Sequence, residues 1–514
     1  MKLSSKSYTS AFLLFYSFLF SCLIVVARYF PFFSIAVFLG SLSSLVYVAK
    51  PNKTRFSNIL YILAMIFSLL ILYRVNDFLV FINIITVFFL GSLLILPDGF
   101  VHSSLGFLHF SFLPFLTLFR TLSSRSEYRL QFISLLRAKM KLGKKSFYEI
   151  FVPIALSIII LIVIVPLLSS ANPFFRKVIL DTLSVLNLKE LFMWIFSDGI
   201  FIWFIRLAMF GFLAYFVPRL ITLTLDGNPI ETKSTISFPL INMSIPKIVT
   251  GLVLFLFFLT QLQLYFSTSN TLLSMGITHS DFAREVFTQL SVVAFVVLVL
   301  IYNDMSRKTF SKILTFILIF EGVFLALIAL KSVYDYSFYW GFTHKRLWGF
   351  TVVFWILGVF SFFTFKYLKN FNNAIFVKSV MVFSCCVLIA VNLLNFDYLI
   401  YTYRKSVTHR GIDYYYLSGL SADSGSYQEQ LKLLDADLNE SSIIPEYSKN
   451  TRALVRLSMK IDALREKYKN IDFRAFNLSE YMQYQKIKSI DIEKYRKLWM
   501  PTINSAQVTP NQSQ

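Results

Sequence analysis

Two charged side chains interrupt otherwise apolar segments of the chain. Arg206 lies within WFIRLAMFGF, and Glu321 lies within FILIFEGVFL. A lone ionised side chain near the middle of a bilayer costs roughly 2.5–3.5 kcal/mol on insertion scales, so such groups are paired, neutral or in contact with water. Two interpretations follow: an Arg206–Glu321 ion pair that fixes helix packing, or a polar cavity between helices. Asp198 is a further candidate partner for Arg206 because it lies one or two helical turns away.

Carboxylates close to the ends of apolar segments form a second set of candidates. Polytopic enzymes that act on lipid-linked substrates can rely on a few loop carboxylates, and the chain offers Asp281, Glu285, Asp335 and Asp413. The patterns GxSxG, Walker A, GxGxxG and a catalytic Cys/His pair do not occur. The histidines do not follow HExxH or another metal-ligand spacing. We therefore expect no cofactor and no metal.

The composition decides which elements must position these residues. Of 514 residues, 56% are hydrophobic and only 15% are charged, whereas a soluble protein of this length would carry more charge. Apolar runs close to the roughly 20 residues that cross a bilayer recur from residue 11 to residue 395. The sequence predicts an all-α, polytopic transmembrane bundle.

Hydropathy predicts eleven membrane spans and leaves a twelfth open. The eleven lie near 11–27, 32–49, 56–73, 78–96, 150–169, 199–217, 246–266, 287–302, 312–330, 347–365 and 377–395. The twelfth candidate, 103–119, is similarly apolar but contains a glycine, a proline and two histidines.

Positive charge favours eleven spans over twelve. Eight Lys and Arg residues lie between residues 120 and 145, and cytoplasmic loops collect such cations. With a cytoplasmic N-terminus and eleven spans this cluster is cytoplasmic, whereas a crossing at 103–119 would place it outside. We therefore interpret 103–119 as re-entrant or interfacial, and expect the segment after residue 395 to be extracytoplasmic. The formal charge of +21 then serves topology and contact with lipid, since no base-reading motif accompanies it and nucleic acid is not expected.

The chain divides into four segments by composition. Residues 1–149 hold the first helices and the basic loop, 150–395 form a transmembrane core, 396–500 form a helical C-terminal tail domain, and 501–514 have a disordered composition. In TRALVRLSMKIDALREKYKN, apolar residues fall on one helical stripe: Leu454, Leu457, Ile461, Leu464 and Tyr468.

Four stretches resemble a bacterial membrane-protein family known as domain of unknown function 4173, which is related to domain 4153. They are SANPFFRKVI (170–179), MGITHSDFAREVFTQL (275–290), YSFYWGFTHKRLWG (336–349), and NFDYLIYTYR through DYYYLSGLSADS (395–424). Phe396, Thr402 and Arg404 depart from the family's pattern. The resemblance covers roughly 150–485. It implies an integral membrane protein and no particular reaction.

On the predicted topology, all four stretches are extracytoplasmic. Their polar and glycine residues are therefore candidates for a binding surface: Asp281, Arg284, Gly341, Thr343, Arg346, Asp397 and Asp413. The alternative role is helix capping and interfacial anchoring. The leading interpretation is a scaffold, sensor or regulator that recognises a protein or another envelope component outside the cell. A transporter with a cavity around Arg206 and Glu321, and an enzyme acting at the outer leaflet, are the alternatives.

The stretch WGFTHKRLWGF (340–350) suggests how the tail domain docks. Gly341 allows a turn, and Thr343 is placed to cap the following helix. Arg346 is unusual on the outer side, where cations are sparse. Because its guanidinium suits a bidentate pair with a carboxylate, we expect it to hold Asp413 or Asp397 and so to dock the tail.

Overall fold

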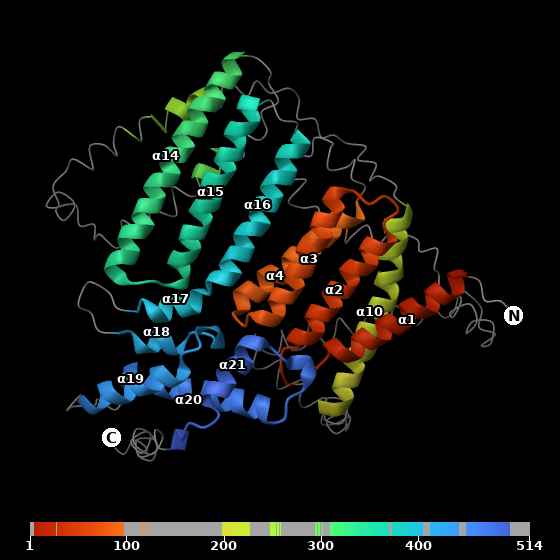
Figure 1. Cartoon of the computed structure of the whole chain (residues 1–514), viewed down its shortest axis with the longest axis vertical. Coiled ribbons are helices and arrows are strands. Elements are labelled where there is room, and N and C mark those ends of the chain that lie inside the picture. The colour runs from red at the N-terminus through yellow and green to blue at the C-terminus, as the bar shows by residue number, and fades with distance from the viewer. Residues whose placement is uncertain are drawn as a thin grey trace, which may run out of the picture. The chain divides into compact units, whose positions relative to one another are not determined.

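The computed structural model describes most of the chain in long segments (Figure 1). These are 5–26, 28–96, 198–226, 309–369, 373–404, 412–440 and 449–493, with residues 117 and 121 and parts of 247–258 and 293–301. All regular secondary structure in these residues is helical. The long helices are α1 (Ser5–Ile24), α2 (Phe32–Ala49), α3 (Arg55–Tyr73), α4 (Asp77–Ile95), α10 (Asp198–Asp226), α14 (Thr309–Trp340), α15 (His344–Lys369) and α16 (Asn373–Leu394).

Seven of the described helices are long and apolar enough to cross a membrane. They confirm the expected all-α polytopic bundle. The spans expected at 32–49, 56–73, 78–96, 312–330, 347–365 and 377–395 correspond to α2, α3, α4, α14, α15 and α16, and 199–217 lies within the longer α10. The expected spans at 150–169, 246–266 and 287–302, and the candidate 103–119, lie wholly or partly outside the described residues, so the count of eleven stays a prediction.

The chain forms two compact units, Met1–Ser34 with Phe119–Asp226 and Ile35–Leu118 with Gly227–Gln514. In the first unit, α1 packs against α10, and the rings of Phe18 and Phe210 meet edge to face with centroids 5.9 Å apart. The four segments expected from composition cut the chain differently and stay predictions.

In the second unit, α14, α15 and α16 lie side by side (Figure 1). Two glycines allow this close packing. A Cβ added at Gly322 of α14 would lie 2.2 Å from Cζ of Phe360 on α15, and one at Gly358 of α15 would lie 2.2 Å from Cζ of Phe383 on α16. Close approach at small residues is a common way for membrane helices to associate.

Helices α3 and α4 form an antiparallel hairpin in the same unit. At the start of α3, Thr54 and Ser57 form a capping box, which satisfies backbone N–H groups that a helix end leaves free. At that end of the hairpin, the buried Lys50 ammonium donates to the carbonyl oxygens of Leu94 and Leu96 at 3.1 and 2.9 Å. Such a cation complements the negative end of the α4 dipole.

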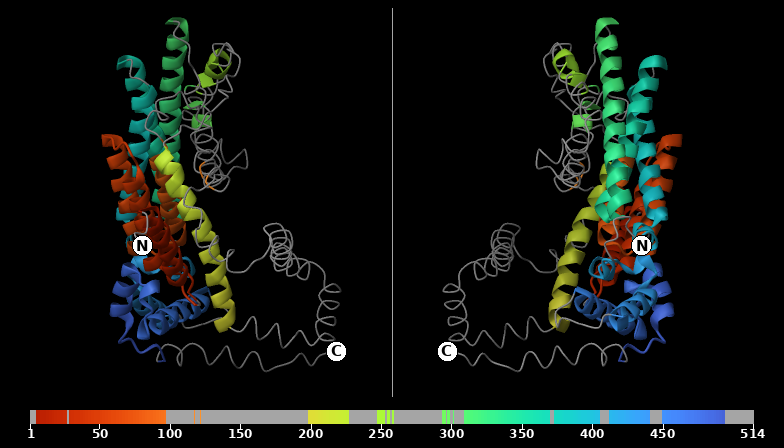
Figure 2. Two further views of the ribbon diagram at one scale, coloured as in Figure 1. Left: turned by 90° about the vertical axis from the view of Figure 1, so that its right-hand side faces the viewer. Right: turned by 90° about the vertical axis from the view of Figure 1, so that its left-hand side faces the viewer.

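The C-terminal tail domain gathers at one end of this unit's bundle, as both side views show (Figure 2). It consists of α17 (Phe396–Thr402), α18 (Tyr414–Ser418), the 3-10 helix η2 (Ala422–Ser424), α19 (Tyr427–Glu440), α20 (Lys449–Lys469), the 3-10 helix η3 (Phe473–Ala475) and α21 (Leu478–Ile487). The predicted apolar stripe of α20 is confirmed, because all five of its members are buried in the core of the domain: Leu454, Leu457, Ile461, Leu464 and Tyr468.

Candidate functional site

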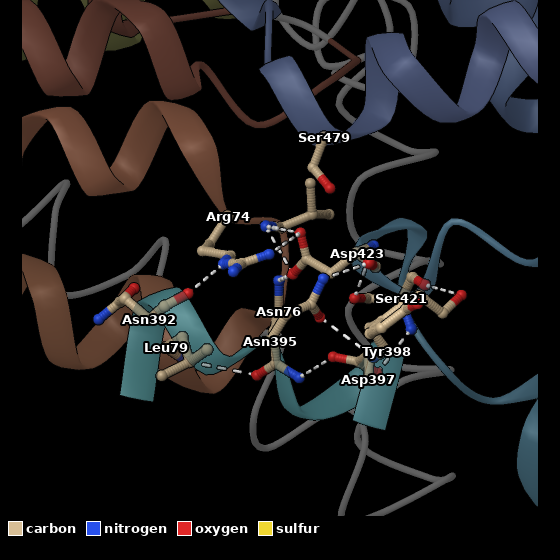
Figure 3. A network of polar contacts seen from close by, with 12 residues as sticks. Arg74, Asn76, Leu79, Asn392, Asn395, Asp397, Tyr398, Ser421, Asp423 and Ser479 are labelled. Carbon is tan, nitrogen blue, oxygen red and sulfur yellow. Dashed lines mark hydrogen bonds and ion pairs between the residues drawn. The ribbon is translucent and has the colours of Figure 1, made fainter. Parts of the chain in front are cut away.

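Polar side chains concentrate where the tail domain meets the ends of the spans (Figure 3). The turn between α3 and α4, the start of α15, and the end of α16 converge here on α17, α18 and η2. We call this set the docking network. Its members are Arg74, Asn76, His344, Asn392, Asn395, Asp397, Tyr416, Ser421, Asp423 and Asn477.

Asp423 of η2 is bound by the backbone at the start of α4. Its carboxylate oxygens accept hydrogen bonds from the backbone N–H of Val75 at 3.1–3.2 Å and from that of Asn76 at 2.9 Å. Free N–H groups and the helix dipole make a helix N-terminus a natural site for an anion. Asp423 therefore supplies a tail carboxylate to an anion site on the membrane hairpin.

Arg74 connects the same carboxylate to the end of α16. Its Nε donates to the carbonyl oxygen of Asn392 at 2.6 Å and its Nη2 to that of Leu393 at 3.2 Å, while Nη1 lies 3.9 Å from Asp423 Oδ1. The last carbonyl groups of a helix have no partner within the helix. Arg74 is only 3% exposed. Its guanidinium therefore meets its own need for partners inside the protein, by bonding these carbonyl groups and lying beside a buried carboxylate.

Asp397 of α17 forms the second half of the network. One oxygen accepts from the Ser421 backbone N–H at 3.1 Å and lies 3.2 Å from His344 Nε2, and the other accepts from Asn76 Nδ2 at 3.1 Å. His344 Nδ1 lies 3.1 Å from the Tyr416 hydroxyl, which also accepts from the His344 backbone N–H at 3.1 Å. In the neutral imidazole, a proton on Nε2 faces Asp397 and leaves Nδ1 to accept from Tyr416.

The pKa values of the two carboxylates shift in opposite directions. Burial raises the pKa of Asp423, and the Ser479 hydroxyl, Arg74 and the Asn76 backbone offset only part of this rise. Burial acts in the same direction on Asp397, but the hydrogen bond and the charge of His344, with Ser421 and Asn76, outweigh it and lower the pKa of Asp397. The difference arises from the side chains around each group, since both are almost fully buried.

Asn477 adds a third link between the tail and α3. This residue is fully buried, and its side-chain amide donates to the carbonyl oxygens of Arg74 at 2.9 Å and Ile71 at 3.3 Å. Its side-chain oxygen accepts from the backbone N–H groups of Ser479 and Glu480 at the start of α21. One asparagine thus begins α21 and fastens it to the end of a span.

The loop expected to dock the tail does so, but through a different residue. Arg346 was expected to hold Asp397 or Asp413, and this prediction is wrong. Its guanidinium instead donates to the Gly341 carbonyl within its own loop and stacks 4.0 Å from the centre of the Tyr336 ring. His344, two residues earlier, contacts Asp397.

The other predicted loop residues act locally. Gly341 has a φ of 78°, which favours glycine. Thr343 directly precedes α15, and its carbonyl oxygen accepts from the Leu347 N–H at 3.0 Å. Asp413 caps α18 by accepting from the Tyr416 N–H at 3.0 Å. Asp281 and Arg284 lie outside the described residues.

Arg206 has a structural partner in the first unit. Its Nε and Nη2 lie 3.4 and 3.3 Å from the carbonyl oxygen of Val25, just after the end of α1, and its guanidinium lies 4.8 Å from the Trp203 ring. This contact places the Arg206 guanidinium of α10 beside the carbonyl end of α1. A cation at this position caps the C-terminal carbonyls of α1.

Glu321 is buried within the second unit at 6% exposure. Among the described residues its Oε2 has no hydrogen-bond partner, and a Cβ added at Gly251 would lie 3.6 Å from that oxygen. Because Arg206 and Glu321 belong to different units, their pairing stays a prediction. The described residues contain no group of three or more His, Cys, Asp or Glu that could hold a metal ion.

Several members of the docking network were not singled out from the sequence. Asp423 lies in the quoted stretch DYYYLSGLSADS, but nothing in its spacing indicates a partner at residue 75. Arg74 could have been predicted as a docking residue, because it is a cation in a short predicted outer loop, as Arg346 is. Asn76 and Asn477 are polar residues of common type, and their sequence context does not distinguish them from ordinary helix caps.

Comparison with known proteins identifies a family but no activity. The profile of the family described as domain of unknown function 4153 matches residues 60–429. No curated protein and no solved structure matches the chain. The matched region contains both carboxylates of the docking network and ends before α20 and α21. Since the match covers more than half of the sequence, this chain belongs to the family of domain of unknown function 4153, the relative of the family that its motifs resemble.

Proposed function

We propose that this protein is a membrane scaffold that holds its tail domain rigidly at the extracytoplasmic ends of its spans, where the domain recognises an envelope component. The observation that carries the proposal is the bonding of Asp423 by Val75, Asn76 and Arg74. A tail that hung on a flexible linker would not need buried, fully hydrogen-bonded carboxylates at the junction.

The contacts of the α3–α4 turn support the proposed topology. This turn meets both the start of α15 and the tail domain, so all three lie on one side of the membrane. An even number of crossings must then separate the turn from α15. Six of the predicted spans fall between them, and counting 103–119 would give seven. Eleven spans, with 103–119 not crossing, therefore agree with these contacts.

The tail domain offers a basic and aromatic surface for recognition. Arg452 and Arg456 of α20 are exposed, and their guanidinium groups lie 5.9 and 5.5 Å from the ring centre of Tyr415, which is itself 45% exposed. Arginine stacked on an aromatic ring is common in binding surfaces because the pair presents both positive charge and flat apolar area. An anionic protein or envelope polymer fits this surface.

Crosslinking in intact cells tests the proposal. A photoreactive amino acid at Tyr415 should capture one extracytoplasmic component, and Arg452→Glu with Arg456→Glu should abolish the capture. The same probe at Lys432, an exposed position of α19 in the same domain, serves as a control for random collisions. Equal capture at both positions, or none at Tyr415, would refute a recognition surface there.

The side of the membrane is tested separately with cysteines in a cysteine-free background. Met459→Cys, at an exposed position of the tail domain, should react with a membrane-impermeant thiol reagent in intact cells. Asn52→Cys, at the exposed turn between α2 and α3, should react only after the membrane is opened. The reverse pattern would place the tail in the cytoplasm.

Transport is the second candidate function, and Glu321 favours it. A buried carboxylate oxygen without a partner among the described residues is typical of sites that bind a proton or a cation in membrane proteins. Glu321→Cys should react with a small water-soluble thiol reagent if a water-filled path reaches it, and should be inert in a scaffold with a sealed core. The enzymatic alternative has less support among the described residues, because Asp413 caps α18 and Asp335 pairs with Lys331 of its own helix. Asp281 and Glu285 lie outside the described residues.

A further inference from the structure

The segment from Ile471 to Met482 carries an exposed apolar patch. Its large side chains remain 38–59% exposed in a domain that otherwise buries its apolar residues: Ile471, Phe473, Leu478, Tyr481 and Met482. Elsewhere in the described part of the tail, the exposed large apolar side chains are scattered singly. Apolar residues gathered within twelve positions mark a contact surface more often than chance exposure.

The patch lies at the level where a span ends. Asn477, in the middle of this segment, donates to the carbonyl oxygens of Ile71 and Arg74, which are the last turn of α3 and the residue after it. Figure 1 shows α21 beside this end of α3. Met482 is five residues further along, roughly 7–8 Å of helix. The patch is therefore held near the boundary between hydrocarbon and headgroups.

The charges of this segment are compensated within the tail domain. Asp472 and Arg474 form an ion pair with a shortest distance of 2.6 Å, and Glu480 is bound by Lys467 of α20. The opposite side of α21 is anchored in the domain by the buried residues Gln483 and Ile487. A segment whose charges are paired and whose apolar side chains are exposed can approach lipid at little electrostatic cost.

We propose that residues 471–482 form an interfacial anchor whose apolar side chains enter the lipid at the α3 end of the bundle. Tyr481 has an apolar ring and a polar hydroxyl, which suits the headgroup level, and Leu478 and Met482 lie one helical turn apart on α21. The anchor and the docking network hold the tail at the same end of the bundle, one through lipid and the other through protein. The inference does not depend on the recognition partner proposed above, nor on which side of the membrane the tail lies.

Depth-dependent fluorescence quenching tests the anchor in the full-length protein. Met482→Cys is made with Cys22, Cys385 and Cys386 replaced by Ser, labelled with an environment-sensitive fluorophore, and reconstituted in vesicles of phosphatidylcholine and phosphatidylglycerol. Met459→Cys is the matched control, because Met459 has 64% exposure against 55% for Met482 and lies on α20, which packs on α18, α19 and α21. A nitroxide near the top of the lipid acyl chain should quench the label at Met482 at least about twofold more than the label at Met459, as expected for a side chain roughly 5–10 Å into the interface.

A second site keeps the test independent of one substitution. Leu478→Cys, one turn away, should behave as Met482→Cys does, and gel filtration verifies that each labelled protein is monodisperse. Equal weak quenching at all three sites would overturn the anchor. A second result would also overturn the anchor: weak quenching in the reconstituted vesicles, with the cysteine of Met482→Cys protected from thiol reagents only in native membranes. That result would assign the patch to a protein partner.

Discussion

Asp423 and Glu321 are both buried carboxylates of the same compact unit, but their surroundings differ. Asp423 accepts hydrogen bonds from two backbone N–H groups and lies beside Arg74, whereas Oε2 of Glu321 has no hydrogen-bond partner among the described residues. Hydrogen-bond donors offset part of the cost of burying a carboxylate and fix its position, whereas a buried carboxylate without donors has neither benefit. The comparison distinguishes Asp423, whose carboxylate docks the tail domain, from Glu321, whose carboxylate is a candidate for binding a proton or a cation.

The two sites also differ in how their partners are held. The N–H groups that bind Asp423 belong to the start of α4, whose N-cap Asn76 fixes the turn, so they are already oriented. Only the Asp423 side chain has to be ordered to make these bonds, which lowers the entropic cost of docking. Glu321 lies inside α14, where the backbone N–H groups of the helix bond to its own carbonyl groups and are not offered to a side chain.

Removing the Asp423 carboxylate should have the largest effect. Asp423→Ala leaves Arg74 buried beside two unpaired N–H groups, and breaking a buried pair in this way costs about 3–5 kcal/mol. The docked tail should then open far more often. Hydrogen exchange of the Val75 and Asn76 amides, followed by mass spectrometry in nanodiscs, should accelerate by at least about a hundredfold, since 1.4 kcal/mol corresponds to tenfold.

Asp413→Ala is the matched control for that variant. Asp413 caps α18 in the same domain but binds nothing on the hairpin, so its loss should cost about 1 kcal/mol locally. Protection of Val75 and Asn76 should persist. Similar exchange in both variants would mean that the carboxylate of Asp423 does not hold the tail.

His344 and Arg346, at the start of α15, should differ in the same assay. His344→Ala removes the contacts with Asp397 and Tyr416 and should weaken docking by about 1–2 kcal/mol. Arg346→Ala removes only a contact within the loop and the stacking on Tyr336, so docking should change by less than about 1 kcal/mol. Hydrogen exchange of the tail helices measures both. A larger effect of Arg346→Ala would restore the original assignment of this loop.

Local patterns in the sequence were sufficient for the elements themselves. The apolar stripe of α20 follows from a period of 3.6 residues, and the spans of α2, α3 and α4 follow from uninterrupted apolar runs, because burial of one face or of a whole helix requires these patterns. The turn at Gly341 was equally accessible, since glycine next to a helix start permits positive φ.

The hydrogen-bond partners of the docking network could not be predicted from local sequence patterns. Asp423 contacts Asn76 across 347 residues of chain, and no local pattern encodes such a distance. Arg346 and His344 are two residues apart at the start of α15, so a small change in helix start decides which of them faces α17. The partner of Arg206 is hidden for the same reason, because its guanidinium lies beside the Val25 carbonyl oxygen across 181 residues of chain.

Glu321→Gln tests whether the buried carboxylate of Glu321 contributes to stability. Because the described residues offer its Oε2 no hydrogen bond, loss of the charge should leave stability unchanged or raise it by less than about 1 kcal/mol. Thermal unfolding of the purified protein measures this. A clear loss of stability, partly recovered when Arg206→Gln is added, would instead support the Arg206–Glu321 pair.

The smallest effect is the pH dependence of docking, in which Asp397 and Asp423 should act with opposite signs. The pKa of Asp397 is lowered below its ordinary value of 3.8, so its contribution is complete above that value and is lost as pH falls through the lowered pKa. The pKa of Asp423 is raised above 3.8, so the docked state binds a proton more readily than the open state, and docking strengthens as pH falls from neutral toward the ordinary value. Protection of Val75 and Asn76, corrected for the intrinsic pH dependence of exchange, should therefore rise on mild acidification and decline in stronger acid.

One variant tests the rise of amide protection on mild acidification, and another tests its decline in stronger acid. Asp423→Asn should remove the rise and Asp397→Asn should remove the decline, each relative to the wild-type protein. The Asn side chain at position 423 keeps one acceptor for the Val75 and Asn76 amides, so enough docking should remain for the profile to be measured. If Asp397→Asn keeps the decline in acid, the loss of docking there arises from another carboxylate, and Glu480, which Lys467 binds next to Asn477, is the first to examine.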